Sequence, residues 1–94
     1  MQKEAARPTI LIENERVRVT QWRFAPGAAT GYHRHACDYV VVPLSTGTLL
    51  LKASDGDQEA RLTAGTPYFR NAGVEHDVIN LNIYEFVFLE IEMK

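Results

Sequence analysis

Short runs of β-forming residues, separated by turn signals, limit the folds open to this chain more than any other feature. The runs are Val17–Phe24, Tyr39–Val42, Thr48–Lys52, Gln58–Leu62, Tyr68–Arg70, Asp77–Asn80 and Leu81–Met93. Turn signals at Pro26-Gly27, Ser45-Thr46-Gly47 and Asp55-Gly56 stand between them. No window combines a helical period with helix caps. Regularly spaced short strands of this kind predict an all-β sandwich or barrel.

Two of these runs are predicted to be buried strands, and residues 1–8 are predicted to lie outside the core of the domain. Tyr39–Val42 is continuously apolar, as expected for a strand with both faces covered. Leu81–Met93 has apolar residues on both parities, and its β-branched and aromatic content favours a buried strand over a helix. Residues 1–8 are polar or small and are predicted to be loose or paired with a partner chain.

The size and charge of the chain argue against several functional classes. Its 94 residues fit a single domain, 1–94, with a thin core that makes a homodimer a reasonable expectation. The formal net charge of -2 and the scattered basic residues argue against nucleic acid and membrane surfaces as partners. The single cysteine, Cys37, cannot form an intrachain disulfide. The N-terminus lacks a signal-peptide pattern, so we expect a cytoplasmic location.

The histidines of this chain carry its strongest chemical signal. His33 and His35 are two residues apart, so on a strand their imidazoles point to the same face. His76 is distant in sequence but can lie beside them in a closed sheet. Three imidazoles bind one divalent ion and leave positions open for water or substrate, as in catalytic sites. Surface histidines or a hydrogen-bonded core cluster would be the non-functional explanation.

Two spaced motifs around these histidines resemble those of the cupins. In the first, five residues separate Gly27 from His33-Arg34-His35. In the second, Gly65 is followed by Asn71-Ala72-Gly73, His76 and Asn80, with Asn71 where cupins usually have proline. The resemblance implies a double-stranded β-helix, a jelly-roll-like barrel of two antiparallel sheets, with His33, His35 and His76 as metal ligands. The sequence is similar to very short cupins, some labelled as β-alanine degradation proteins.

The fourth ligand usual in cupins, a glutamate, is absent. Tyr39 occupies its position and Asp38 lies beside it. Three arrangements are open: a three-histidine site like that of thiol dioxygenases, Asp38 as a fourth ligand from a distorted strand, or Tyr39 lining the pocket as a catalytic contact. We favour the first combined with the third, because strand parity points Tyr39 with the histidines and Asp38 away.

Three further residues are candidates for substrate contact. Arg23 and Arg70 could hold a substrate carboxylate in a fork geometry, and Tyr68 could donate a hydrogen bond. The competing interpretation of each arginine is a surface residue or a structural ion pair, and neither reading is favoured.

Three functions are compatible with these features. The first is an enzyme acting on a small organic acid or thiol, with dioxygenase-like chemistry on iron or Lewis-acid chemistry, such as isomerisation or hydrolysis, on zinc, nickel or manganese. The second is a non-catalytic sensor that binds a small metabolite. The third is a barrel with a vestigial site. Ligand type alone does not select the metal.

Overall fold

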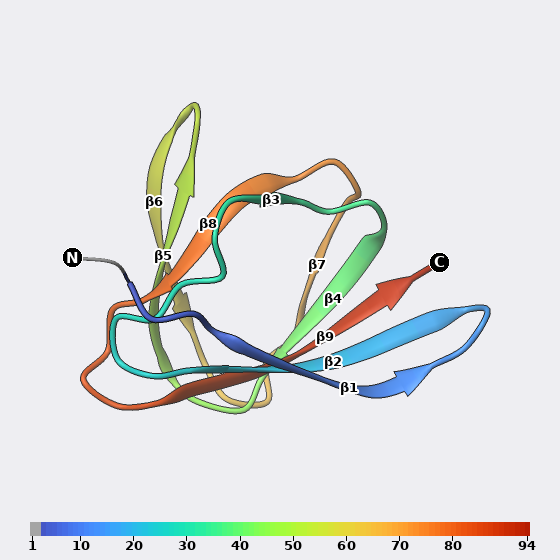
Figure 1. The fold of residues 1–94 in the computed structure, drawn as a ribbon, viewed down its shortest axis with the longest axis horizontal. Coiled ribbons are helices and arrows are strands. Elements are labelled where there is room, and N and C mark those ends of the chain that lie inside the picture. Colours follow the sequence, from blue (N-terminus) through green and yellow to red (C-terminus); the bar gives the residue numbers. More distant parts are fainter. Residues whose placement is uncertain (1–2) are drawn as a thin grey trace.

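Nine strands in two antiparallel sheets make up the computed structural model, which describes residues 3–94 (Figure 1). The strands are β1 (Arg7–Glu13), β2 (Val17–Phe24), β3 (His33–Arg34), β4 (Asp38–Pro43), β5 (Gly47–Ala53), β6 (Gly56–Leu62), β7 (Tyr68–Arg70), β8 (Glu75–Asn80) and β9 (Phe86–Met93). One sheet has the order β1-β2-β9-β4-β7 and the other β3-β8-β5-β6. Nothing within residues 3–94 is helical, so no helix there could cross a membrane. The all-β prediction is confirmed.

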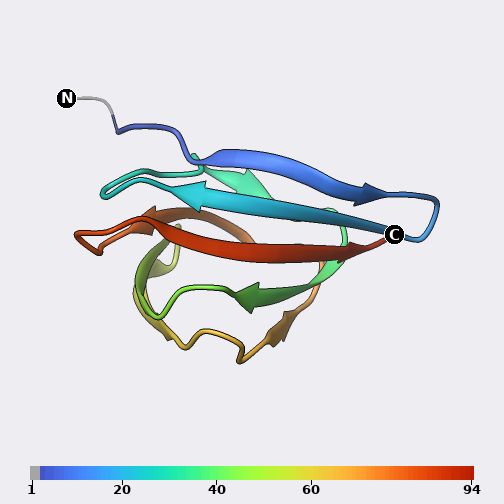
Figure 2. The ribbon, with the colours of Figure 1, turned by 90° about the horizontal axis from the view of Figure 1, so that it is seen from below.

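The core lies between the two sheets. Figure 2 shows β1, β2 and β9 side by side, with β4, β5, β6 and β7 curving beneath them. Alternate residues of β9 face inward, because Phe86 and Phe88 are buried while Val87 and Leu89 are half-buried. The same alternation in β4 buries Tyr39 and Val41. Burial of these side chains is the main stabilising contribution in so small a domain.

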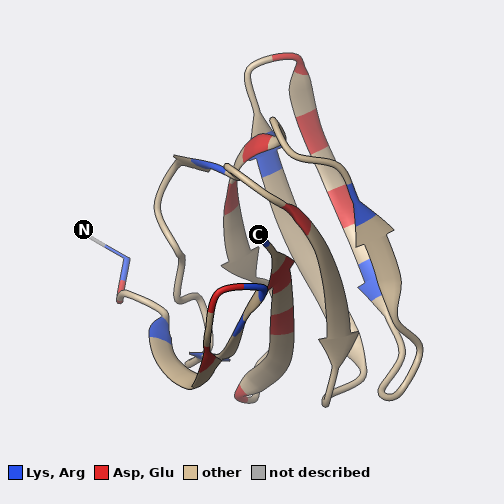
Figure 3. Ribbon diagram, turned by 90° about the vertical axis from the view of Figure 1, so that its right-hand side faces the viewer, with Lys and Arg blue, Asp and Glu red and all other residues tan. Residues whose placement is uncertain are grey.

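The β5–β6 hairpin forms where the Asp55-Gly56 signal predicts it. Ala53 pairs with Gly56, which begins β6 with a φ of 132° that residues with a Cβ rarely adopt. β6 is an edge strand, and residues of both charges lie along it (Figure 3) and are exposed. Charges on an edge discourage pairing with another chain. β1, one edge of the five-stranded sheet, instead exposes Ile10, Leu11 and Ile12.

Asn80 links the end of β8 to the end of β2 and to the loop that precedes β9. It is 1% exposed, and its Nδ2 donates to the carbonyl oxygens of Phe24 at 3.1 Å and Tyr84 at 2.9 Å. Its Oδ1 accepts hydrogen bonds of 2.8 Å from the backbone and side chain of Asn82. A buried amide satisfied on both sides holds backbone segments in register. Asn80 thereby fixes the loop that follows β2 against the end of β8.

The prediction of one strand over Leu81–Met93 is wrong at its start. β9 begins at Phe86, and the preceding residues form a loop in which Ile83 is 94% exposed. The cause is Asn82, whose side chain accepts from the Thr48 amide at 3.1 Å and donates to the Thr48 carbonyl at 3.0 Å. These bonds occupy the groups that a continuing strand would have paired with.

Two other expectations need correction. The outward residues of β4, Val40 and Val42, are half-buried, because no further layer within residues 3–94 covers that face of the sheet. The N-terminal segment is held from its fifth residue rather than loose. Ala5 bridges to Ala29, the Ala6 amide donates to the Ala29 carbonyl at 2.9 Å, and Ala6 is buried. Residues 1–2 lie outside the described part of the chain.

Candidate metal centre

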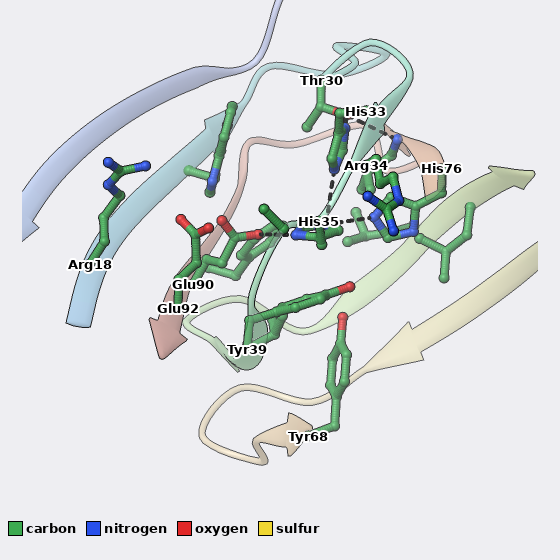
Figure 4. Close-up of a pocket in the computed structure, with 17 residues that line it drawn as sticks. Arg18, Thr30, His33, Arg34, His35, Tyr39, Tyr68, His76, Glu90 and Glu92 are labelled. Atoms are coloured by element: carbon green, nitrogen blue, oxygen red, sulfur yellow. Dashed lines mark hydrogen bonds and ion pairs between the residues drawn. The ribbon is translucent and has the colours of Figure 1, made fainter. Parts of the chain in front are cut away.

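The sheet pairing brings the three histidines together at one wall of the barrel. His33 on β3 lies directly opposite His76 on β8. His35 follows β3, and its backbone stays attached to the next segment through hydrogen bonds with Val74 and Gly73. The Nε2 atom of His35 lies 3.0 Å from that of His33 and 3.1 Å from that of His76 (Figure 4). Side chains distant in sequence therefore converge on one point.

The spacing of these nitrogens fits a single metal ion. Imidazole nitrogens that bind one ion at about 2.0–2.1 Å lie roughly 3.0–3.4 Å apart. Ligand atoms of the three residues all lie within 4.8 Å of one another. The ring planes of His33 and His35 meet at 76° and those of His35 and His76 at 90°, so the rings do not stack face to face. Imidazole donors suit zinc, copper, iron and nickel.

Burial keeps two of the imidazoles in the form that binds metal. Burial lowers the pKa of His35 to about 4, and the neighbouring His33 and His76 add to the effect. Burial also lowers the pKa of His76 to about 4, with His33 as the next cause. Only a neutral imidazole offers a lone pair to an ion. Both rings are therefore available as ligands at neutral pH.

His33 is oriented by the loop that precedes it. Its Nδ1 lies 2.8 Å from the Gly31 carbonyl oxygen, which can only accept, so Nδ1 carries the proton and Nε2 is free. The loop is anchored to β8, since the Gly31 amide donates to Asp77 at 3.0 Å and the Val78 amide donates to the Thr30 hydroxyl at 3.1 Å. Local backbone contacts thus select the tautomer of His33.

A cavity of about 390 Å³ adjoins the histidines. Its lining combines apolar side chains with a few polar ones: Arg18, Trp22, Thr30, His33, Arg34, His35, Ala36, Tyr39, Val41, Leu49, Leu51, Tyr68, His76, Val78, Phe88, Glu90 and Glu92. The volume is appropriate for a small ligand. The Tyr39 ring stacks on the His35 ring, with centroids 3.9 Å apart and planes at 17°. Burial raises the pKa of Tyr39 and that of Tyr68, so both phenols stay protonated.

The structure does not bring the two candidate arginines or Asp38 into this cavity. Arg23 projects from the opposite face of β2 and pairs with Glu85 at 2.9 Å, because Trp22 and Phe24 take the inward positions. Arg70 is exposed and lies over the Tyr68 ring. The Asp38 carboxylate accepts a hydrogen bond of 2.7 Å from the Ala72 amide. Neither arginine lines the cavity, although Arg70 lies across the strands from Tyr39 at its edge. Contact of either arginine with a substrate stays a prediction. Asp38 is bonded elsewhere, as its strand parity implies.

Sequence reasoning missed three polar residues that line the cavity: Arg18, Glu90 and Glu92. The available signal was parity, because Glu90 and Glu92 continue the inward face set by Phe86 and Phe88. Burial raises the pKa of Glu90 to about 7, the charge of Glu92 adds to the rise, and the Trp22 indole N–H opposes it. Arg18 lies directly across the strands from Glu92, and its guanidinium also donates to Glu13 at 2.8 Å.

The fold and the histidine cluster define a small cupin barrel, and solved structures agree. A cupin domain from Bordetella pertussis is 56% identical, matches with a TM-score of 0.98, and covers 100% of this chain and 98% of its own. A conserved protein with a double-stranded β-helix domain from Klebsiella pneumoniae is 18% identical, with a TM-score of 0.79 over 99% of this chain and 80% of its own. The second similarity shows the fold alone.

The model of the family described as auxin binding protein matches residues 7–86, and the chain belongs to this family. A curated relative, the β-alanine degradation protein BauB of Pseudomonas aeruginosa, is 61% identical over 87 residues. That alignment covers 93% of this chain and 92% of the relative. The prediction of a small cupin of this type is confirmed.

Proposed function

We propose that this chain holds one divalent metal ion through His33, His35 and His76 and acts as an enzyme on a small organic acid or thiol. The observation that carries the proposal is the convergence of three Nε2 atoms on the wall of a cavity. Crowding imidazoles at 3.0 and 3.1 Å has little packing value. Two of the three are held neutral, which favours binding of a cation over proton uptake.

The residues around the cluster fit the handling of a small anionic ligand. A bound ion would supply oxygen activation if it is iron, or Lewis-acid polarisation of a carbonyl if it is zinc, nickel or manganese. Tyr39 and Tyr68 keep their protons and point their hydroxyls toward the space beside the histidines (Figure 4), where they can donate to a carboxylate. The apolar wall formed by Val41, Leu49 and Phe88 limits water there.

The name of the curated relative supports the same class of ligand. It places that protein in β-alanine degradation, whose compounds include small carboxylic acids. The cavity of about 390 Å³ suits a molecule of this size. The alternative is a sensor that binds such a metabolite without converting it, since Tyr39 occupies the position of the usual glutamate ligand.

Turnover separates the two functions. The chain, purified without an affinity tag, is loaded with ferrous iron under anaerobic conditions, and parallel samples receive zinc, nickel or manganese. Each sample is offered a panel of small carboxylic acids and thiols. Oxygen uptake or a new product in any sample, absent from a His76→Ala control, supports the enzyme. Saturable ligand binding with no product in any sample would leave the sensor as the function.

We also propose that the outer face of the five-stranded sheet pairs two copies of this chain. The strand register aligns Ile12, Val19, Ile91, Val40 and Phe69 in one apolar row across all five strands. Ile12 is 51% exposed and Phe69 is 50% exposed. Antiparallel sheets usually present polar residues to water on the uncovered face. A second copy offers the same flat apolar surface, and sheets stack well face to face.

A charge placed in this row is expected to separate the copies. Ile91→Glu buries an unpaired carboxylate in the interface, so the variant sediments as a monomer where the parent chain sediments as a dimer. Gln58→Glu adds the same charge to the exposed strand β6 and is expected to leave the dimer intact. A parent chain that sediments as a monomer at micromolar concentrations would contradict the proposal.

A further inference from the structure

Glu90 is a buried carboxylate placed behind the metal-facing side of His35. It lies on β9 and points inward after Phe86 and Phe88, and it is 8% exposed. Its Oε2 lies 3.8 Å from the Nδ1 of His35, while the Nε2 of the same ring faces the other two histidines (Figure 4). The carboxylate and the histidine cluster therefore lie on opposite sides of one imidazole.

The proton of His35 needs an acceptor on the side of Glu90. A neutral imidazole carries one N–H, and the ring can offer Nε2 to an ion only if that proton is on Nδ1. His33 meets the same requirement with the Gly31 carbonyl oxygen at 2.8 Å. The Nδ1 of His35 makes no hydrogen bond within residues 3–94, and Glu90 is the acidic group that faces it. The stacked Tyr39 ring holds the imidazole in the plane that directs Nδ1 toward Glu90.

Trp22 supplies a second donor beside the same carboxylate. Its Nε1 is buried and has no hydrogen-bond partner among the described residues. Trp22 pairs with Phe88 across β2 and β9, which places it diagonally from Glu90 on the inner face. The indole N–H is close enough to lower the pKa of Glu90 but does not reach hydrogen-bond distance. An indole can only donate, so a small movement of the carboxylate would satisfy both groups.

We propose that Glu90 is a positioning residue that accepts the Nδ1–H of His35 and is itself held by the Trp22 indole N–H. This inference rests on the proposed metal site. Glu90 would fix the tautomer that leaves Nε2 free and would make that nitrogen a stronger donor, as carboxylates do behind metal-bound histidines. Neither Glu90 nor Trp22 would touch the ion.

Cobalt binding by matched variants tests the role of Glu90. Co²⁺ is titrated into the chelator-treated chain, and affinity and visible absorption are recorded for the parent, Glu90→Gln and Glu92→Gln. Glu92 lies two residues further along the same inward face, so its variant makes the same carboxyl-to-amide change in the same cavity. We expect Glu90→Gln to weaken Co²⁺ binding about 10–100-fold and to shift the absorption of the bound ion. We expect Glu92→Gln to weaken Co²⁺ binding far less, because Glu90, not Glu92, faces the Nδ1 of His35.

Trp22→Phe tests the link between the indole and the carboxylate. We expect it to weaken Co²⁺ binding less than Glu90→Gln does, and to have no further effect when combined with Glu90→Gln, because both changes act through one contact. Equal Co²⁺ affinities for Glu90→Gln and Glu92→Gln would overturn the role of Glu90 while leaving the metal site intact. Additive effects of Trp22→Phe and Glu90→Gln would overturn the link. A parent chain that binds no Co²⁺ would overturn the metal site and this inference together.

Discussion

A chain carrying His76→Ala is expected to retain its fold but no longer to bind one metal ion per chain. The substitution removes one of three converging ligands, and the remaining pair, His33 and His35, comes from a single segment. Each ligand contributes a large share of the binding free energy in protein metal sites, so the affinity should fall by roughly two orders of magnitude or more. Elemental analysis of untagged protein should give about one ion per parent chain and far less per variant chain. Circular dichroism checks the fold.

Asp38→Ala is the matched control for this loss. Its carboxylate is near the cluster in sequence but accepts a hydrogen bond from the Ala72 amide at 2.7 Å. The change therefore removes a nearby acidic residue without removing one of the three converging ligands. We expect its metal content to equal that of the parent chain. Loss of metal from Asp38→Ala together with retention by His76→Ala would reverse the assignment of ligands.

Motif spacing and turn chemistry predicted most of the fold and the histidine cluster. The β-forming residues predicted β2 and β7 with the bounds that the structure shows, and Asp55-Gly56 predicted the turn of the β5–β6 hairpin. His33 and His35 share a face because they are two residues apart, but only the pairing of β3 with β8 brings His76 opposite. That pairing is a tertiary property, and the sequence indicated it through resemblance alone.

The inward side of β2 and of β9 was the property that sequence alone could not provide. In β2, Arg23 lies between Trp22 and Phe24, and either parity satisfies a strand with apolar and polar residues mixed. In β9, Val87, Leu89 and Ile91 form an apolar parity that could equally have faced the core. The inward position of Glu90 therefore follows only once Phe86 and Phe88 are known to face inward. The outer face of this sheet is itself apolar, which removed the contrast that normally identifies the core side. The missed carboxylate and the misplaced arginine share this cause.

Acid is expected to destabilise the metal-free protein between about pH 6.5 and pH 4.5. His35 and His76 have pKa values of about 4 in the folded chain, against 6.5 for an ordinary histidine. As the pH decreases, the unfolded chain therefore binds these protons first, and the folded chain loses stability. Glu90 acts in the opposite direction, because its pKa rises from 4.5 to about 7 and the folded chain binds that proton first. Because two histidines are opposed by one carboxyl group, the free energy of unfolding falls by up to about 1.4 kcal/mol for each unit by which the pH decreases. Urea denaturation of chelator-treated protein at stepped pH measures it.

Glu90→Gln isolates the histidine contribution to this pH dependence. The variant removes the opposing group, so its stability should fall more steeply over the same range, approaching about 2.7 kcal/mol per pH unit. Arg23→Gln, whose guanidinium pairs with Glu85 on the outer face, should follow the parent curve because it leaves all three buried groups in place. A parent curve that is flat from pH 6.5 to 4.5, with no steepening in Glu90→Gln, would mean that burial does not keep His35 and His76 neutral. The site would then lose the property that favours a metal ion over protons.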